Sequence, residues 1–216
     1  PHGSYTTPPD YPNPFKPYWD QVNYLALGKG KRDDREAYFN RYKNAVHYAD
    51  SLAGRLLAGL RARGLLDKTI VVITGAHGQE FNDNGEGYWG HTSNFSRWQT
   101  QVPFLVRWPG RAPQTFSHRS SHLDVAPTLL REVLGCANPI VEYSTGRALT
   151  DGSPRDFLLI SAYNRFSIVQ DERIIVYYFA GLIESYDAQY HELEDARVDP
   201  AIMREAIEQV GRFYAN

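Results

Sequence analysis

The chain has 216 residues, which suits one large domain or one domain with a small appendage. Its hydrophobic share of 42%, charged share of 22% and net charge of −2 are ordinary for a soluble globular protein and give no reason to expect a nucleic-acid partner. The single cysteine excludes an internal disulfide, and the longest apolar stretch, residues 174–183, is about half of the ~20 residues that a membrane-spanning helix needs.

The first predicted elements are an irregular segment and a long helix. Prolines recur through residues 1–19, which predicts an extended conformation without a helix. Apolar residues then recur at helical spacing over residues 33–63, where Asp33 and Glu36 resemble a capping box and Gly64 is a plausible end. The single apolar stripe of this helix predicts packing against a sheet or another helix.

Two strands and a second helix follow in the sequence. The apolar run that ends at Gly75 predicts a strand over residues 69–74, buried on both faces as in a parallel sheet. Residues 102–110 predict a second such strand. Residues 120–135 predict a helix that Asp124 caps. Its inward-facing residues are expected to be Val125, Leu129, Leu130, Val133 and Leu134.

The pattern of apolar residues changes after Gly152. Four short apolar runs lie close together, at residues 157–163, 166–170, 173–180 and 182–188. This spacing predicts hairpins of an antiparallel sheet, and Asp199 and Pro200 then begin a final helix over residues 199–215. The predicted fold class is therefore α/β, a mixed sheet flanked by helices with a small antiparallel sheet and a final helix at the C-terminal end. We expect residues 1–150 to form the main portion, and residues 151–216 to form the C-terminal sheet and helix of the same domain.

Two histidines lie where sheet-based active sites are usually built. His77 directly follows the strand at 69–74, and His91 lies on the long polar loop after it. Two imidazoles on one loop are compatible with a divalent metal. The alternative is that each is an ordinary surface residue, because the spacing of His77 and His91 is loose beside known zinc motifs.

A basic cluster near the start of the long helix has two interpretations. It consists of Lys29, Lys31, Arg32 and Arg35. Such a cluster either meets anionic lipid headgroups or forms the solvated entry of a helix, and short basic clusters are common on surfaces.

Residues 69–110 resemble the second half of the sulfatase family, within the alkaline phosphatase superfamily. The shared pattern is an apolar strand, Asp-His-Gly, a loop with a further histidine, Val-Pro, a second apolar strand and a Trp-Pro-Gly turn. PHGSY at residues 1–5 resembles the family's Pro-His-x-x-Tyr segment, and SSHLDVAPTLL resembles its Asp-x-x-Pro-Thr-Leu element. Among the subfamilies, VEYSTGRAL and the terminal RFYAN look most like the YejM (PbgA)-like inner-membrane proteins of Gram-negative bacteria.

The resemblance implies a metal-assisted hydrolase or transferase that acts on sulfate or phosphate esters, with Zn, Mn, Mg or Ca as the divalent cation. His77 matches the metal-binding histidine of the family, His91 its loop histidine and His2 the histidine of its early segment. We therefore expect His77 and His91 to bind metal, His91 and His2 to be catalytic, and His2 and Asn94 to contact the substrate. The three imidazoles are expected to converge on one site.

Two departures from the family pattern put the activity in doubt. Ala76 stands where the family has the aspartate of Asp-His-Gly, so a negatively charged metal ligand is missing. The earlier half of the family's fold, which supplies further acidic ligands and the nucleophile, has no counterpart in this sequence. The chain also begins at PHGSY without a methionine. The sequence therefore predicts an incomplete fold, cut from a longer protein.

Two functions remain open. One is part of a sulfatase-like ester hydrolase, which the three histidines favour. The other is a non-catalytic module that senses lipid, lipopolysaccharide or cardiolipin, in envelope homeostasis, which Ala76 favours. In both cases the resemblance implies a periplasmic domain attached to the bacterial inner membrane through a missing N-terminal region, with a small-molecule ester or a lipid headgroup as partner. An α/β domain without any small-molecule site is the third, least specific interpretation.

Overall fold

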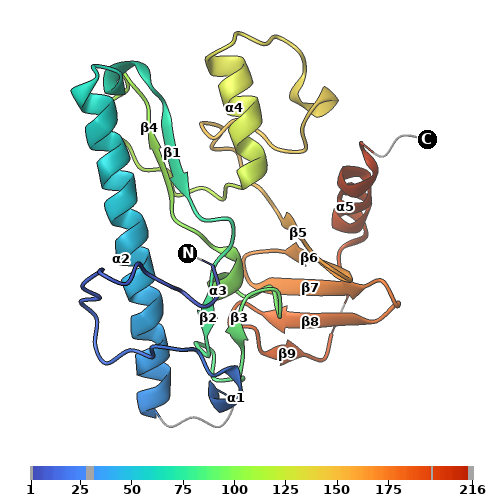
Figure 1. Ribbon diagram of the computed structural model, residues 1–216. Helices are drawn as coiled ribbons and strands as arrows, with labels where there is room; N and C mark the ends of the chain where they lie inside the picture. The colour runs from blue at the N-terminus through green and yellow to red at the C-terminus, as the bar shows by residue number, and fades with distance from the viewer. Residues whose placement is uncertain (1, 28–31, 196, 214–216) are drawn as a thin grey trace. The chain divides into compact units, whose positions relative to one another are not determined.

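The computed structural model describes residues 2–27, 32–195 and 197–213 (Figure 1). The chain divides into two compact units, Pro1–Ala112 and Pro113–Asn216. Among the described residues, no helix is both long and apolar enough to cross a bilayer. The mixed α/β character that the sequence predicts is confirmed.

The first unit is built around one long helix, α2 (Arg32–Ala62), which confirms the helix predicted at 33–63. A short helix, α1 (Tyr24–Leu27), precedes it and a 3₁₀ turn (Leu66–Lys68) follows it. The remaining elements are two small sheets and a one-turn helix (Figure 1). They are β1 (Val71–Thr74), β2 (Glu80–Phe81), β3 (Trp89–Gly90), α3 (Arg97–Thr100) and β4 (Phe104–Arg107).

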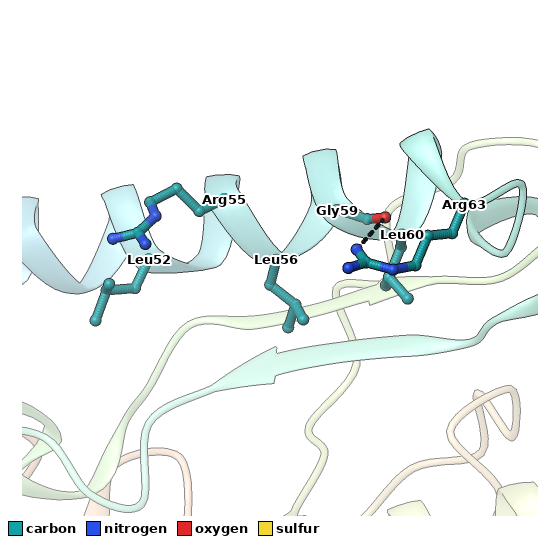
Figure 2. A pocket seen from close by; sticks show the side chains of 6 residues that line it. All are labelled: Leu52, Arg55, Leu56, Gly59, Leu60 and Arg63. Carbon is teal, nitrogen blue, oxygen red and sulfur yellow. Dashed lines mark hydrogen bonds between the residues drawn. The ribbon is translucent and has the colours of Figure 1, made fainter.

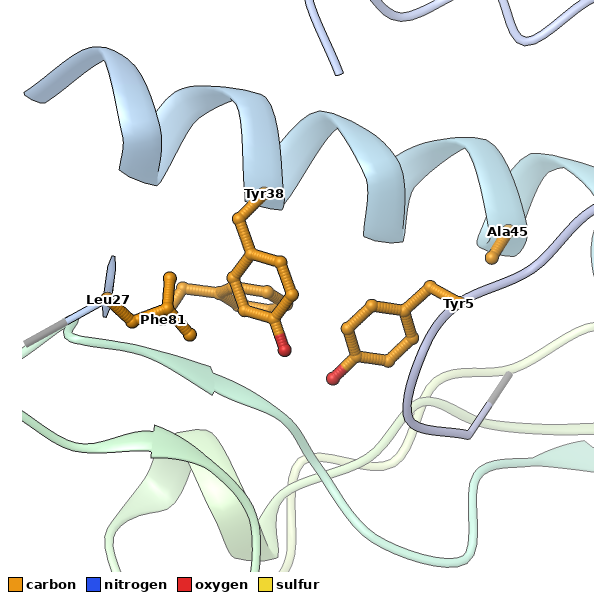
Figure 3. Packing of buried hydrophobic residues seen from close by; sticks show 5 residues of the cluster. All are labelled: Tyr5, Leu27, Tyr38, Ala45 and Phe81. Carbon is orange, nitrogen blue, oxygen red and sulfur yellow. The ribbon is translucent and has the colours of Figure 1, made fainter. Parts of the chain in front are cut away.

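The core of this unit lies between α2, the N-terminal segment and strand β2. Figure 3 shows its buried residues, with the rings of Tyr5, Tyr38 and Phe81 gathered below the helix. The ring centroids of Tyr5 and Tyr38 are 5.6 Å apart, and those of Tyr38 and Phe81 are 5.4 Å apart. Aromatic rings at these separations contribute beyond the area that they bury. The cluster therefore fixes the early segment and the strand after His77 against one helix.

Buried polar side chains of α2 hold the extended N-terminal segment in place. Arg41 donates hydrogen bonds to the backbone oxygens of Ser4 and Trp19, at 2.5 and 2.6 Å. Asn44 accepts a bond from the backbone N–H of Phe15 and donates one to its carbonyl oxygen. Residues 2–19 contain no helix or strand, as their prolines predict, so these side chains supply the partners that secondary structure would otherwise provide.

The two strands predicted to be buried in a parallel sheet are arranged differently. Strands β1 and β4 pair antiparallel, with Ile73 opposite Leu105, and form a two-stranded sheet. Their apolar side chains are exposed, to 38% for Ile73 and 60% for Leu105. The prediction of burial on both faces was wrong for this chain, because β1 has β4 as its sole partner within the described ranges.

The apolar stripe of α2 is only partly covered. Tyr38 and Ala45 are buried, whereas Leu52 and Leu56, further along the stripe, are 41% and 60% exposed. A groove of about 400 Å³ runs along this end of the helix, and Figure 2 shows its leucines pointing off the helix toward the β1–β4 ribbon. It is lined by Leu52, Arg55, Leu56, Gly59, Leu60 and Arg63.

The second unit begins with a shorter helix than the sequence predicts. Helix α4 (Val125–Glu132) follows a 3₁₀ turn (His122–Asp124), and a second 3₁₀ turn covers Ile140–Glu142. Val133 and Leu134, predicted to face inward, lie beyond the helix and are 51% and 72% exposed. The cap also differs. The carboxylate of Asp124 bonds the backbone N–H of Ser121 in a capping box of the 3₁₀ turn and makes no side-chain cap bond to α4.

The antiparallel sheet and final helix of the second unit are confirmed. The five strands pair in chain order, and the fifth was not predicted. Helix α5 (Pro200–Gly211) has Asp199 as its N-cap, as predicted, and ends before the predicted residue 215. The Asp199 side chain accepts from the N–H of Ala201, and Ala206 packs with Phe157 and Ile168 of the sheet region. The strands are β5 (Leu158–Ala162), β6 (Arg165–Val169), β7 (Arg173–Tyr178), β8 (Ile183–Asp187) and β9 (Glu192–Leu193).

Candidate metal centre

Three histidines from separate segments of the first unit meet at one place. His2 belongs to the extended N-terminal segment, where its carbonyl oxygen accepts from the N–H of Tyr5. His77 follows β1 after two residues, and His91 directly follows β3. One ligand nitrogen from each of His2, His77 and His91 lies within 4.8 Å of the other two. The prediction that these imidazoles converge is therefore confirmed.

The three rings are packed closely against one another. The centroids of His77 and His91 are 4.0 Å apart with an interplanar angle of 23°, so these two rings are stacked. His2 meets both edge-on, at 4.8 Å from His91 and 5.8 Å from His77. His2 and His77 are exposed and His91 is half-buried, so the cluster is open to solvent on one side.

Hydrogen bonds fix which nitrogen of two rings is available as a ligand. Nδ1 of His77 lies 2.8 Å from the carbonyl oxygen of Gly78, and Nδ1 of His91 lies 3.0 Å from Oε1 of Gln79. Both oxygens are acceptors, so these contacts favour a proton on each Nδ1. A neutral ring in that tautomer has its lone pair on Nε2. A second partner on the non-ligating nitrogen is the usual way in which proteins orient a metal-binding histidine.

The electrostatics of the cluster favour a neutral imidazole at His91. Burial, and then the neighbouring rings of His77 and His2, lower the pKa of His91 below its usual value of 6.5. A protonated imidazole cannot bind a metal. The cluster therefore keeps the His91 lone pair available at neutral pH.

The donor set of the cluster fits a borderline transition metal better than a hard cation. Three neutral imidazoles suit Zn²⁺ and similar transition-metal ions, such as Ni²⁺ and Cu²⁺. Mg²⁺ and Ca²⁺ require oxygen ligands. Within the described part of the chain, the cluster contains no carboxylate, and Ala76, exposed beside His77, has no ligand atom. Nitrogens about 2.0–2.1 Å from a zinc ion are roughly 3.4 Å apart in a tetrahedral site, so binding requires the three rings to close slightly.

Asn94, predicted to contact substrate, is occupied elsewhere. It is 4% exposed, its Nδ2 donates to Oε2 of Glu80 at 2.7 Å, and its Oδ1 accepts from the N–H of Ser96 at 2.9 Å. These bonds make Asn94 part of the internal support of the loop after His91. Its predicted substrate contact remains a prediction.

Sequence reasoning missed the buried carboxylate of Glu80. This side chain is fully buried on β2, three residues after His77, and its Oε2 also accepts from Nε2 of Gln99 at 2.7 Å and from Oγ of Ser96 at 3.3 Å. Its only signal in the sequence is its position in the polar loop after His77. Nothing in that pattern distinguishes it from Glu86 on the same loop, which is exposed.

Two glycines are required by the local backbone. A Cβ on Gly78 would collide with the carbonyl oxygen of Trp98, because the chain after His77 passes directly over the loop end. Gly90 has a φ of +101°, which a residue with a side chain rarely adopts. These positions allow His77 and His91 to approach each other closely.

The basic cluster near α2 is only partly described. Lys29 and Lys31 lie outside the described residues, as does the side chain of Arg32. Arg35 donates to the carbonyl oxygen of Phe81 at 2.6 Å and pairs with Asp83 at 3.3 Å. Arg35 therefore tethers the loop after β2, and a contact of this cluster with lipid remains a prediction.

The fold and the histidine cluster together define a class of protein. The sulfatase family model matches residues 1–135, and the chain belongs to the sulfatase family. The chain is 24% identical over 197 residues to the inner membrane protein YejM of Salmonella typhimurium, a match that covers 90% of this chain and 33% of that protein. It is 30% identical over 110 residues to choline-sulfatase of Rhizobium meliloti, covering 51% of this chain and 20% of that enzyme.

Solved structures confirm the fold. The phosphonate monoester hydrolase of Agrobacterium radiobacter superimposes with a TM-score of 0.65 at 19% identity, over 84% of this chain and 42% of that one. A protein solved with its substrate D-glucosamine-2-N,6-O-disulfate superimposes with a TM-score of 0.59 at 20% identity, over 82% and 40%. The chain spans about a third of the length of YejM and under half of these structures, so the predicted partial fold is confirmed.

Proposed function

We propose that this chain is the sulfatase-like portion of a membrane-attached, periplasmic protein related to YejM, and that its three-histidine cluster binds a divalent transition metal. The observation that carries the metal proposal is the convergence of the ligand nitrogens of His2, His77 and His91 within 4.8 Å of one another. The family relation and the similarity to an inner membrane protein support the placement at the membrane.

The arrangement supports a role in cleavage of a sulfate or phosphate ester. A bound divalent cation would polarise the ester oxygens and stabilise the negative charge that develops on them. His77 and His91 would hold the metal, and the contacts of their Nδ1 atoms with Gly78 and Gln79 would leave Nε2 of each ring free to bind it. His2 closes the cluster from the exposed side, where an ester group would enter. The His2 and His91 rings are then the groups placed to contact the transferred group.

A second function, a regulatory module that binds a lipid headgroup without turnover, is favoured by Ala76. This residue stands beside His77 and contributes no ligand atom to the cluster. Loss of a charged ligand weakens metal binding, since disturbing even an outer partner of a ligand costs ~10–100-fold in affinity. Ester-cleaving activity would be lost before the fold, which is held by α2 and the aromatic core around Tyr38 and Phe81.

Metal analysis of the full-length protein, together with ester hydrolysis, tests these functions. We expect stoichiometric Zn²⁺ or Co²⁺ binding that His77→Ala abolishes and that His191→Ala, a change of an exposed histidine of the second unit, leaves intact. Ala76→Asp should add an oxygen ligand and improve binding of Mn²⁺ or Mg²⁺. Turnover of an aryl sulfate or a phosphonate monoester by the unmodified protein would reject the regulatory function. Absence of metal and of turnover in both forms would reject the enzyme function.

A further inference from the structure

The fully buried carboxylate of Glu80 is the least expected group near the histidines. A buried carboxylate is costly unless hydrogen bonds or opposite charges compensate it. Three donors, from Asn94, Ser96 and Gln99, converge on Oε2 of Glu80. The other oxygen, Oε1, is buried and has no hydrogen-bond partner among the described residues. Among the described residues, the Glu80 carboxylate therefore accepts hydrogen bonds through Oε2 alone.

Two of the three donors, from Asn94 and Ser96, belong to the loop that His91 begins, and the third, from Gln99, belongs to helix α3 directly after that loop. Glu80 pairs with Gly90 across the β2–β3 ladder, and Gly90 directly precedes His91. Gln79, directly before Glu80, accepts from Nδ1 of His91. Oε2 of Glu80 then binds the loop again further on, at Asn94 and Gln99. Gln79 and Glu80, which are adjacent in the chain, thus bond the His91 ring and both ends of the loop that it begins.

Gln99 extends the same network to His77. Its backbone oxygen accepts from the N–H of Gly78 at 2.8 Å, and the carbonyl oxygen of Gly78 is the acceptor for Nδ1 of His77. Its side-chain Oε1 accepts from the N–H groups of Ser93 and Asn94, at 3.1 and 3.3 Å. One continuous set of bonds therefore joins the backbones that carry His77 and His91.

We propose that Glu80 is a positioning residue that sets the separation and the tautomers of His77 and His91 through this network. It acts by geometry, as an acceptor for three donors, and does not itself bind the metal, since its Oε2 is saturated with donors and both oxygens are buried. This inference rests on the proposed metal function. It adds to that function a residue that determines whether the histidines can act together.

Metal affinity of Glu80 variants in the full-length protein tests the proposal, with Co²⁺ absorption as the probe and Zn²⁺ in competition. Glu80→Ala should weaken binding by ~10–100-fold, the range typical for outer partners of metal ligands. Glu80→Gln should restore affinity to within about threefold, because it keeps the length of the side chain and an acceptor oxygen for the donors of Asn94 and Gln99. Thr128→Ala is the control, because it removes a buried polar side chain whose bonds, to Asp124 and Leu149, lie within the second unit. The control should leave affinity unchanged.

The results separate positioning from other roles. If Glu80→Gln binds as weakly as Glu80→Ala, the charge matters and the proposal is wrong. If Glu80→Ala binds the metal as tightly as the unmodified protein does, the proposal is wrong as well. Should Glu80→Ala fail to fold, Asn94→Ala leaves two of the three donors and should show an intermediate loss. An unchanged affinity for Asn94→Ala would then overturn the proposal.

A metal-free measurement distinguishes failure of this proposal from failure of the metal function. Nitrogen NMR of the imidazoles should show His77 and His91 protonated on Nδ1 in the unmodified protein. Glu80→Ala should mix the two tautomers of His91, and Glu80→Gln should not. If the unmodified protein binds no metal but the tautomers respond in this way, the metal function fails and the positioning role stands. Unchanged tautomers in Glu80→Ala would overturn the positioning role.

Discussion

The imidazole rings of His77 and His91 are stacked with their centroids 4.0 Å apart, although 13 residues separate them in the sequence. Stacked imidazoles in contact repel each other when both are protonated. Their Nδ1 protons are directed to different acceptors, the carbonyl oxygen of Gly78 and Oε1 of Gln79. A metal requires a neutral ring with an available lone pair, which in a ring that donates through Nδ1 lies on Nε2.

The first prediction concerns the titration of His91 in the metal-free protein. Burial, and then His77 and His2, lower its pKa below 6.5, so an NMR titration should give a midpoint below that value. The imidazole of His91 therefore takes up a proton more readily in the unfolded chain than in the folded protein. The contribution of His91 to the free energy of unfolding is complete above pH 6.5 and is lost as the pH falls below it. His77→Ala should raise the His91 midpoint only partway, because burial is the larger cause. A midpoint at or above 6.5 in the unmodified protein would contradict the geometry.

A pair of glycine substitutions should have opposite effects on stability. Gly78→Ala places a Cβ against the carbonyl oxygen of Trp98, and such a collision with backbone should cost about 1–3 kcal/mol of unfolding free energy. Gly54→Ala lies within helix α2, where a Cβ meets nothing within 4 Å. It should stabilise the protein by about 0.5–1 kcal/mol, because glycine is a poor helix former. Urea unfolding measures both. Equal shifts of the same sign would mean that Gly78 does not approach Trp98.

Much of the fold could be predicted from the sequence because it is encoded locally. The helical period fixes α2, and the short apolar runs after residue 152 fix the hairpins, since neighbouring strands in the chain pair in order. The direction of β1 could not be predicted in this way. Its run of apolar residues is typical of a strand buried on both faces, but its neighbour in this chain is β4, which is antiparallel and leaves Ile73 exposed.

The candidate site also has features that the sequence predicts and features that it does not. The convergence of His2, His77 and His91 was predicted through the family resemblance, because each histidine matches a motif. The role of Glu80 could not be predicted from the sequence. Its burial depends on three donors, from Asn94, Ser96 and Gln99, that meet only when the loop after His91 folds back over β2. The internal bonds of the Asn94 amide could not be predicted for the same reason, and its substrate contact stays a prediction. The division at residue 150 remains a prediction for the whole protein.

A third prediction concerns the ion pair of Asp124 and Arg155 in the second unit. The two side chains are 2% and 11% exposed, and both guanidinium nitrogens bond the carboxylate, at 2.8 and 3.1 Å. The same carboxylate accepts from the N–H groups of Ser121 and Arg147. Removing one partner of a buried pair typically costs ~3–5 kcal/mol, so Asp124→Ala should destabilise the second unit by that order.

Chemical denaturation, monitored by hydrogen exchange of the α4 amides, measures this loss of stability. Asp67→Asn is the matched control, because Asp67 pairs with Arg107 at 2.7 Å but is 93% exposed. Exposed pairs contribute little, so the control should unfold like the unmodified protein. A similar loss in both variants would show that the burial of Asp124 does not matter.

The last prediction concerns the apolar surface of the β1–β4 sheet. Leu105 is 60% exposed, it lies opposite Ile73 in the antiparallel register, and the leucine-lined groove of α2 lies on the same unit. An apolar strand pair with open edges tends to associate with other chains. The 216-residue chain, produced alone, should therefore self-associate in a concentration-dependent way, which light scattering coupled to gel filtration measures. Leu105→Lys should reduce this association with little loss of stability, because the side chain is mostly in solvent. Leu25→Lys changes a side chain that is 89% exposed outside the sheet, and it should leave the association unchanged. If the two variants associate equally, the surface that drives association lies elsewhere than on this sheet.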